Sequence, residues 1–145
     1  MTGAESYQWV HARITIHVRN AGDRLRVRRW LPPLLWAGVI VFATSVPTTF
    51  VPPQLSPFDK AIHFSMYAVL AALLAWYVLE NRKLLPATIL SLVLVAAFGA
   101  ADEWHQRFIP GRSSEFADWV ADSLGGVSGV VAAAFYTRRQ GRSVR

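Results

Sequence analysis

The chain has 145 residues, of which 53% are hydrophobic, and a formal net charge of +6. This length is typical of a single domain. The chain contains no cysteine, which excludes disulfides, thiolate nucleophiles and cysteine-ligated metals.

The basic residues are concentrated at the two ends of the apolar part of the chain, which argues against nucleic acid as a partner. Residues 1–29 form a basic arm, residues 30–136 an apolar domain and residues 137–145 a basic tail. Clusters of this kind suit a membrane surface that contains anionic lipid. Residues 14–18 alternate in a way that fits a short strand, but we expect the arm to be flexible or to lie at the membrane interface.

Four apolar segments follow the arm, and we expect each to form a membrane-spanning helix. They cover residues 30–46, 56–79, 84 to beyond 101, and about 114–136. The first is close to the shortest length that spans a bilayer. The second begins with a capping pattern, in which Ser56 precedes Pro57 and Asp59 follows three residues after Ser56. Four such segments cannot all be buried in a soluble core of this size.

Two further features concern helix packing and orientation. Gly125 and Gly129 form a small-xxx-small pair, which favours close approach of two helices. The arm, the Arg82-Lys83 turn and the tail all fall on one side of a four-span topology, which the positive-inside rule places in the cytoplasm. The sequence therefore predicts an all-α integral membrane protein of the cytoplasmic (inner) membrane, a bundle of four transmembrane helices with both termini cytoplasmic.

The acidic residues show the opposite distribution, because most of them map to the outer half of the predicted bundle. These are Asp59, Asp102, Glu103, Glu115, Asp118 and Asp122. The polar stretch 101–112, between two apolar segments, holds acid, amide and guanidinium groups together. Such groups are costly beside hydrocarbon unless they are paired, and they are candidates for function by default.

The types of residue in this outer half suggest acid–base chemistry or anion binding. Neighbouring carboxylates raise one another's pKa, share a proton or recruit a cation, and a histidine can complete an acid–base pair or ligate a metal. We take Asp59, His63, Asp102 and Glu103 as candidate catalytic residues. We take Lys60, Tyr67, Gln106, Arg112, Asp118 and Asp122 as candidate substrate-binding residues. No histidine or carboxylate spacing here is specific for a metal, so no metal ligand is assigned and any cofactor is unknown.

Each of these residues also has a structural interpretation. Asp59 can simply cap its helix, and His63 can form a hydrogen bond between helices. Asp102 and Glu103 can be ion-pair partners of Lys60 and Arg112.

At these residues the chain resembles the VanZ-like family over about residues 31–135. The resemblance is carried by four pieces: Phe42-x-x-Ser45-x-Pro47; Asp59-Lys60-x-x-His63-Phe64-x-x-Tyr67; Asp102-Glu103-x-x-Gln106-x-Phe108-x-Pro110-Gly111-Arg112; and Asp118 with Gly125. The family often has asparagine where this chain has Asp122. The resemblance implies a small multispan membrane protein, in a family whose founding member is associated with low-level teicoplanin resistance, and it implies no settled reaction.

Two functions therefore stay open at the sequence level. One is an enzyme at the outer leaflet that acts on a lipid-linked or phosphorylated envelope component, with Gln106 orienting and Arg112 holding an anion. The other is a noncatalytic module that binds an envelope lipid, precursor or lipoglycopeptide at the same residues. A proton or solute pathway ranks third, because four short spans leave little room for alternating access. Membrane lipid is the expected partner, and the oligomeric state is unknown.

Overall fold

A computed structural model describes residues 28–51, 58–79 and 84–140 of the chain. Its contacts divide the chain into two units, Met1–Pro32 and Pro33–Arg145. In the first unit, the described residues 28–32 are helical. The predictions for most of the arm, for the cap at Ser56 and Pro57, for the turn at residues 80–83 and for the end of the tail lie outside the described residues.

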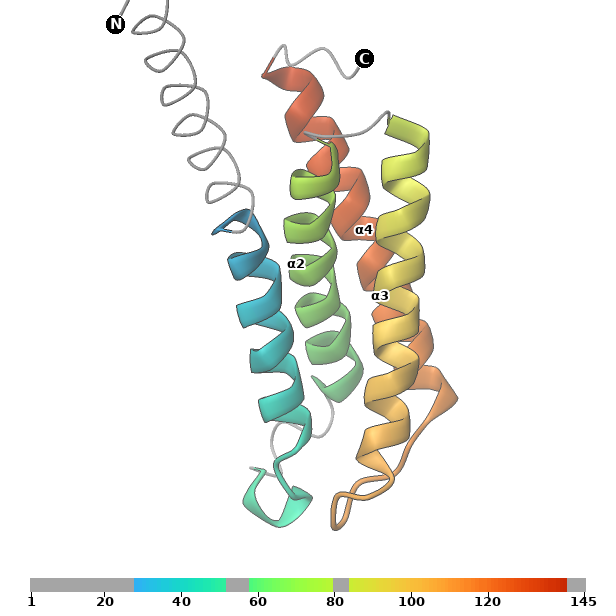
Figure 1. Ribbon diagram of the computed structural model, residues 1–145. Coiled ribbons are helices and arrows are strands. Elements are labelled where there is room, and N and C mark those ends of the chain that lie inside the picture. Colours follow the sequence, from blue (N-terminus) through green and yellow to red (C-terminus); the bar gives the residue numbers. More distant parts are fainter. Residues whose placement is uncertain (1–27, 52–57, 80–83, 141–145) are drawn as a thin grey trace, which may run out of the picture. The chain divides into compact units, whose positions relative to one another are not determined.

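Within the second unit, the described residues form helices and no strand, as predicted. Residues 33–44 are helical and are called the first helix below. They are followed by the short 3-10 helix η1 (Thr48–Phe50), α2 (Asp59–Leu79), α3 (Leu84–Gln106) and α4 (Phe116–Arg139). The predicted C-terminal end of α2 and the predicted start of α3 are confirmed, and α4 begins and ends a few residues later than expected. In Figure 1 the first helix, α2, α3 and α4 lie side by side.

Three of these helices are long and apolar enough to cross a membrane. They are Asp59–Leu79, Leu85–Gln106 and Phe116–Arg139, with mean hydropathies of 1.8, 1.8 and 1.2. A helix of about 20 residues is roughly 30 Å long, which matches the hydrocarbon thickness of a bilayer. The protein is therefore a multi-pass membrane protein. The described helical residues 28–44 fall just short of this length, so the fourth span stays a prediction.

Burial in the bundle is the reverse of that in a soluble protein. Large apolar side chains such as Leu35, Phe42 and Val131 are exposed, each by more than 60%. The buried set includes eight polar residues: Thr44, His63, Ser91, Asp102, Glu103, Gln106, Asp118 and Asp122. Because hydrocarbon offers no hydrogen bonds, polar groups in a membrane bundle turn inward to meet one another.

The close packing of α2 against α4 depends on the predicted glycine pair. A Cβ atom on Gly125 would collide with the carbonyl oxygen of Phe64, and one on Gly129 with the carbonyl oxygen of Ala68. Both contacts are with main-chain atoms, so the two helices touch backbone to backbone. This approach places His63 of α2 opposite the first half of α4.

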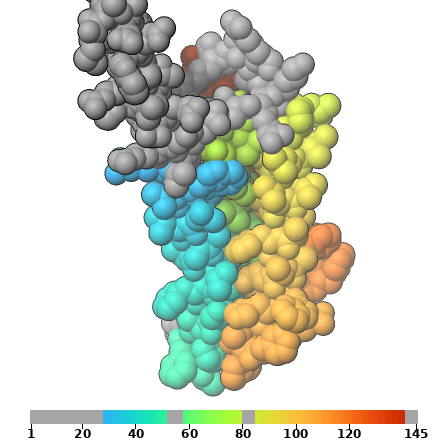
Figure 2. Space-filling view, in the orientation of Figure 1, coloured from blue at the N-terminus to red at the C-terminus, as the bar shows by residue number. Residues whose placement is uncertain are grey.

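The polar half of the bundle lies at the end that carries η1 and the connection between α3 and α4. Figure 2 shows the segment near residues 45–50 beside the segment near residues 105–110 at this end. Thr48 Oγ1 donates a hydrogen bond to the carbonyl of Gly111, at 3.0 Å, and so ties these two connections together.

Candidate functional site

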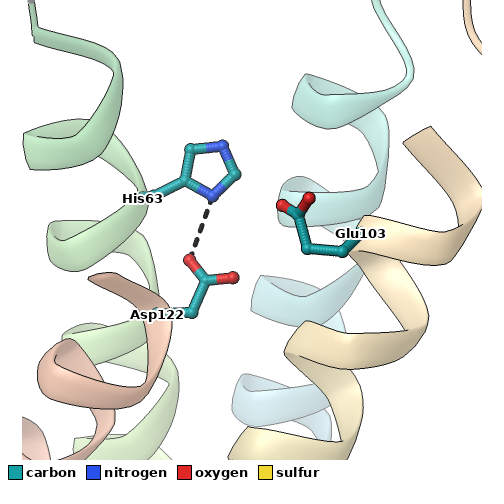
Figure 3. A group of neighbouring side chains, drawn as sticks. All are labelled: His63, Glu103 and Asp122. Carbon is teal, nitrogen blue, oxygen red and sulfur yellow. Dashed lines mark hydrogen bonds and ion pairs between the residues drawn. The ribbon is translucent and has the colours of Figure 1, made fainter. Parts of the chain in front are cut away.

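His63, Glu103 and Asp122 come from three different helices and meet inside the bundle (Figure 3). His63 Nδ1 lies 3.0 Å from Asp122 Oδ1. Each of the three residues offers one ligand-type atom, and these atoms lie within 4.8 Å of one another. All three are at least 94% buried. The sequence separates His63 from Asp122 by 59 residues, and the α2–α4 contact brings them together.

The second oxygen of Asp122 has no partner. Asp122 is fully buried, and its Oδ2 atom forms no hydrogen bond within the described part of the chain. Figure 3 shows this oxygen turned towards Glu103. Gly99 of α3 leaves room for it, because a Cβ atom at Gly99 would lie 3.2 Å from Oδ2. A buried carboxylate oxygen without a donor is unusual and needs an explanation.

Asp102 is held by hydrogen-bond donors from three elements. Thr44 Oγ1 of the first helix lies 2.8 Å from Asp102 Oδ1. Tyr67 Oη of α2 and Gln106 Nε2 of α3 lie 3.4 and 3.3 Å from Asp102 Oδ2. All of these side chains are buried. Asp102 therefore links three helices through neutral donors.

A chain of hydrogen bonds continues from Gln106 to the α3–α4 loop. Gln106 Nε2 also lies 3.4 Å from Glu103 Oε1, and the backbone N–H of Glu115 donates to Glu103 Oε2 at 3.0 Å. Lys60 of α2 then pairs with Glu115 at 3.0 Å and with Asp118 at 2.8 Å. The hydrogen bond from Lys60 lowers the pKa of the Glu115 carboxyl below its usual value.

Arg112 follows a tight turn. Gly111 has a φ of 76°, and the N–H of Arg112 donates to the carbonyl of Ile109 at 3.1 Å, which is the pattern of a type II turn with Pro110 at its second position. The guanidinium donates two hydrogen bonds to main-chain carbonyls. Nη2 donates to Ala43 in the last turn of the first helix, at 3.1 Å, and Nε donates to Val46, two residues beyond that helix, at 3.0 Å. It thereby satisfies carbonyls at the helix terminus.

A cavity of about 310 Å³ opens beside these groups. Its wall has four polar members, Thr44, Asp59, His63 and Arg112, and its remaining members are apolar. The apolar lining is Ala43, Val46, Phe50, Val51, Ile62 and Met66. This volume is at the lower end of the range for small-molecule sites. His63 faces both this cavity and the buried carboxylates, so it connects the two.

The structure brings most of the candidate residues into one half of the bundle but divides them among different partners. His63, Glu103 and Asp122 form one group, and Asp102 with Tyr67 and Gln106 forms a second. Asp118 is engaged by Lys60, and Asp59 and Arg112 lie on the cavity wall. The roles assigned to these residues from sequence stay predictions.

One structural alternative from the sequence is not what the structure shows. It made Lys60 and Arg112 ion-pair partners of Asp102 and Glu103. Lys60 pairs with carboxylates of the α3–α4 loop and α4, and Arg112 binds main-chain carbonyls. The reason is geometric, because Asp102 and Glu103 point into the bundle while Lys60 stays at its surface, with a side chain 53% exposed.

Sequence reasoning missed the roles of two residues, Thr44 and Glu115. Thr44 is the closest donor to Asp102, and the signal for it was a hydroxyl at the polar end of an apolar helix. Ser45, which belongs to the motif carrying the resemblance, instead donates to the carbonyl of Val41 in its own helix. The backbone N–H of Glu115 donates to Glu103, and its side chain accepts a hydrogen bond from Lys60. No sequence pattern indicates this double role.

The arrangement can support acid–base chemistry. A carboxylate at Nδ1 of a histidine selects the tautomer and stabilises the protonated ring, which leaves Nε2 to exchange a proton. The His63–Asp122 pair has this form, and His63 reaches the cavity.

A family model described as VanZ/LLP1 matches residues 6–137 of the chain. Comparisons with curated proteins and with solved structures found no match.

Proposed function

Because the chain belongs to the VanZ/LLP1 family, we propose that this membrane protein binds the polar part of an amphiphilic cell-envelope component in the cavity beside His63. We propose further that His63, oriented by Asp122, acts on that component as a general acid and base. The component is a lipid-linked or phosphorylated precursor, or a lipoglycopeptide. The polar end of the bundle faces the outside of the cytoplasmic membrane.

The observation that carries the proposal is the composition of the cavity wall. Apolar side chains such as Ile62 and Met66 share the wall with Arg112, Asp59 and His63. Such a wall suits a molecule with a charged head and an apolar chain, which is the chemistry of a membrane amphiphile. Arg112 suits a phosphate or carboxylate head, because its guanidinium has donors beyond those used for the two carbonyls.

The proposed orientation rests on charge. Arg138 and Arg139 lie in the last turn of α4, whereas Asp118 lies in its first turn. The ends of α4 thus carry opposite charge, and the positive-inside rule assigns the basic end to the cytoplasm.

A noncatalytic binding module is the second candidate, and a specific observation favours it. Asp102 and Glu103, both expected to be catalytic, accept hydrogen bonds from within the protein. On this alternative the buried polar network only holds the helices in register, and the cavity alone performs the function.

The test is to identify what stays bound to the protein. Purification in native-membrane nanodiscs, followed by extraction and mass spectrometry, should recover one class of envelope amphiphile enriched over bulk lipid. Ile62→Trp fills the cavity and should remove this enrichment. Ile89→Trp is the matched control, since Ile89 is 53% exposed on α3 and does not line the cavity. Equal recovery from the two variants, or no enrichment in the wild type, would refute the proposal.

A further variant separates catalysis from binding. His63→Gln replaces the imidazole by a polar amide, which cannot act as a general base at neutral pH. If the protein is an enzyme, this variant should retain the amphiphile unconverted, and the wild type should also contain product. If both proteins hold the same unchanged molecule, the binding module is the correct function.

The variants His63→Gln and Ile62→Trp also test a cellular role. We propose that the protein contributes to tolerance of lipoglycopeptides such as teicoplanin, because the founding member of the VanZ-like family is associated with low-level teicoplanin resistance. A strain carrying His63→Gln or Ile62→Trp should then match the deletion strain in teicoplanin susceptibility, and Ile89→Trp should match the wild type.

A further inference from the structure

We propose that His63, Glu103 and Asp122 form a binding site for one divalent transition-metal ion, with Zn²⁺ as the best-fitting ion. The site would be formed by one residue each from α2, α3 and α4. Metal binding goes beyond the proposed function, because it can occur whether or not the cavity takes an amphiphile. With an ion bound, His63 would be a ligand in place of the general acid and base.

The donor set and its geometry fit such an ion. One imidazole nitrogen and two carboxylate oxygens are ligands that Zn²⁺ accepts, and Mn²⁺ also takes carboxylates. In a tetrahedral zinc site with bonds of about 2.0–2.1 Å, ligand atoms lie roughly 3.3 Å apart. Here the three candidate atoms lie within 4.8 Å of one another. An ion bound between them would draw these atoms closer together.

The unpartnered oxygen of Asp122 points to a missing positive group. Asp122 Oδ2 is buried, accepts no hydrogen bond from the described residues and is turned towards Glu103 (Figure 3). Two carboxylates that face each other without a donor between them repel, and burial makes the repulsion stronger. A cation between them would satisfy Oδ2 and replace the repulsion with attraction.

The charges of the surrounding residues support the same conclusion. Three carboxylates, those of Asp102, Glu103 and Asp122, are buried in this half of the bundle. The two nearby cations are engaged elsewhere, Lys60 with two other carboxylates and Arg112 with main-chain carbonyls. One protonated imidazole cannot balance three ionised carboxylates in a low-dielectric interior. A divalent ion supplies the balance.

The proposed ligands are also held from outside, as ligands in metal sites usually are. The backbone N–H of Glu115 donates to one oxygen of Glu103, and Gln106 lies within hydrogen-bonding distance of the other. Gly99 keeps the space next to Asp122 free of a side chain. Three protein ligands leave a coordination position open, and because His63 lines the cavity, that position is available to water or to a bound head group.

The experiment uses the full-length protein in detergent, with any affinity tag removed. After treatment with a chelator and dialysis, titration with Zn²⁺ against a chromogenic chelator should give one bound equivalent. Asp122→Asn and Glu103→Gln should each weaken binding by more than the roughly 10–100-fold that loss of an outer hydrogen bond to a ligand costs. Asp102→Asn is the matched control, since it removes a nearby buried carboxylate that is outside the ligand set, and it should weaken binding clearly less than either ligand variant does.

A second measurement does not depend on any variant folding. X-ray absorption of the wild-type zinc complex should show one imidazole and otherwise oxygen ligands, with no sulfur. The proposal is overturned if the wild type binds no stoichiometric Zn²⁺, if the spectrum lacks imidazole, or if Asp102→Asn weakens binding as much as Asp122→Asn. Failure of these tests would leave the amphiphile proposal standing, because that proposal is measured by bound lipid.

Discussion

The contact between α2 and α4 allows one prediction to be worked in detail, because two glycines meet main-chain atoms there. Replacing Gly125 or Gly129 by alanine places a methyl group against the carbonyl oxygen of Phe64 or Ala68. A main-chain carbonyl inside a helix cannot rotate away. The two helices must therefore separate or tilt to accept either methyl group.

The magnitude follows from two opposing effects. Alanine in place of glycine within a helix gains about 0.5–1 kcal/mol from backbone propensity. Forcing an additional carbon into a packed contact costs about 1–3 kcal/mol. Each substitution should therefore lower the free energy of unfolding by up to about 2.5 kcal/mol. Gly38→Ala is the matched control, since a Cβ atom there meets nothing within 4 Å, and it should be neutral or stabilising.

The site adds a second readout that differs between the two glycines. Gly125 lies one turn after Asp122 and packs on the residue next to His63, whereas Gly129 lies a further turn away. Separation of the helices at Gly125 lengthens the 3.0 Å contact between His63 and Asp122 directly. Gly125→Ala should therefore weaken Zn²⁺ binding more than Gly129→Ala does.

The assay unfolds the purified protein in detergent by heat or by added sodium dodecyl sulfate and monitors the loss of helix by circular dichroism. If Gly125→Ala and Gly129→Ala stabilise the protein as Gly38→Ala does, the backbone contact between α2 and α4 does not exist as described. That result would also remove the reason for placing His63 beside Asp122.

Two other predictions concern the polar network. Thr44→Val removes the closest donor to the buried Asp102 and should lower the free energy of unfolding by about 1–3 kcal/mol. Thr48→Val removes an exposed hydroxyl and should cost less. Equal losses of stability in chemical denaturation would contradict the role of Thr44 as a donor to Asp102. Lys60→Met should lower the free energy of unfolding at neutral pH by about 1–3 kcal/mol, because it leaves the carboxylate of Asp118, whose side chain is only 5% exposed, without its cation. Because Lys60 lowers the pKa of Glu115, their contact stabilises the fold at pH values above the ordinary carboxyl pKa. This stabilisation is lost as the pH falls through the lowered pKa. The stability difference between wild type and Lys60→Met should shrink in acid, and a difference that grows there would refute this assignment.

The helices and their approximate ends could be predicted from the sequence because they depend on local properties. Long apolar segments separated by polar or proline-rich stretches specify helices, whatever their partners. Asp102, Glu103 and Gln106 lie on the last turns of α3, in line with the prediction that the third helix extends beyond residue 101. The close approach at Gly125 and Gly129 could also be predicted, because a small-xxx-small pair reports a property of one helix face.

The pairing of charges was decided only by the tertiary structure. From sequence, Lys60 had several acids to choose from, and Arg112 was expected to bind an anion. The rotation of each helix about its axis, set by the glycine contact and by inward-facing polar groups, determines which of them meet. It gives Lys60 to Asp118 and Glu115. It also pairs His63 with Asp122, which is 59 residues away in the chain. The sequence could not predict this pair, because which residues of two helices face each other is determined only when the helices pack.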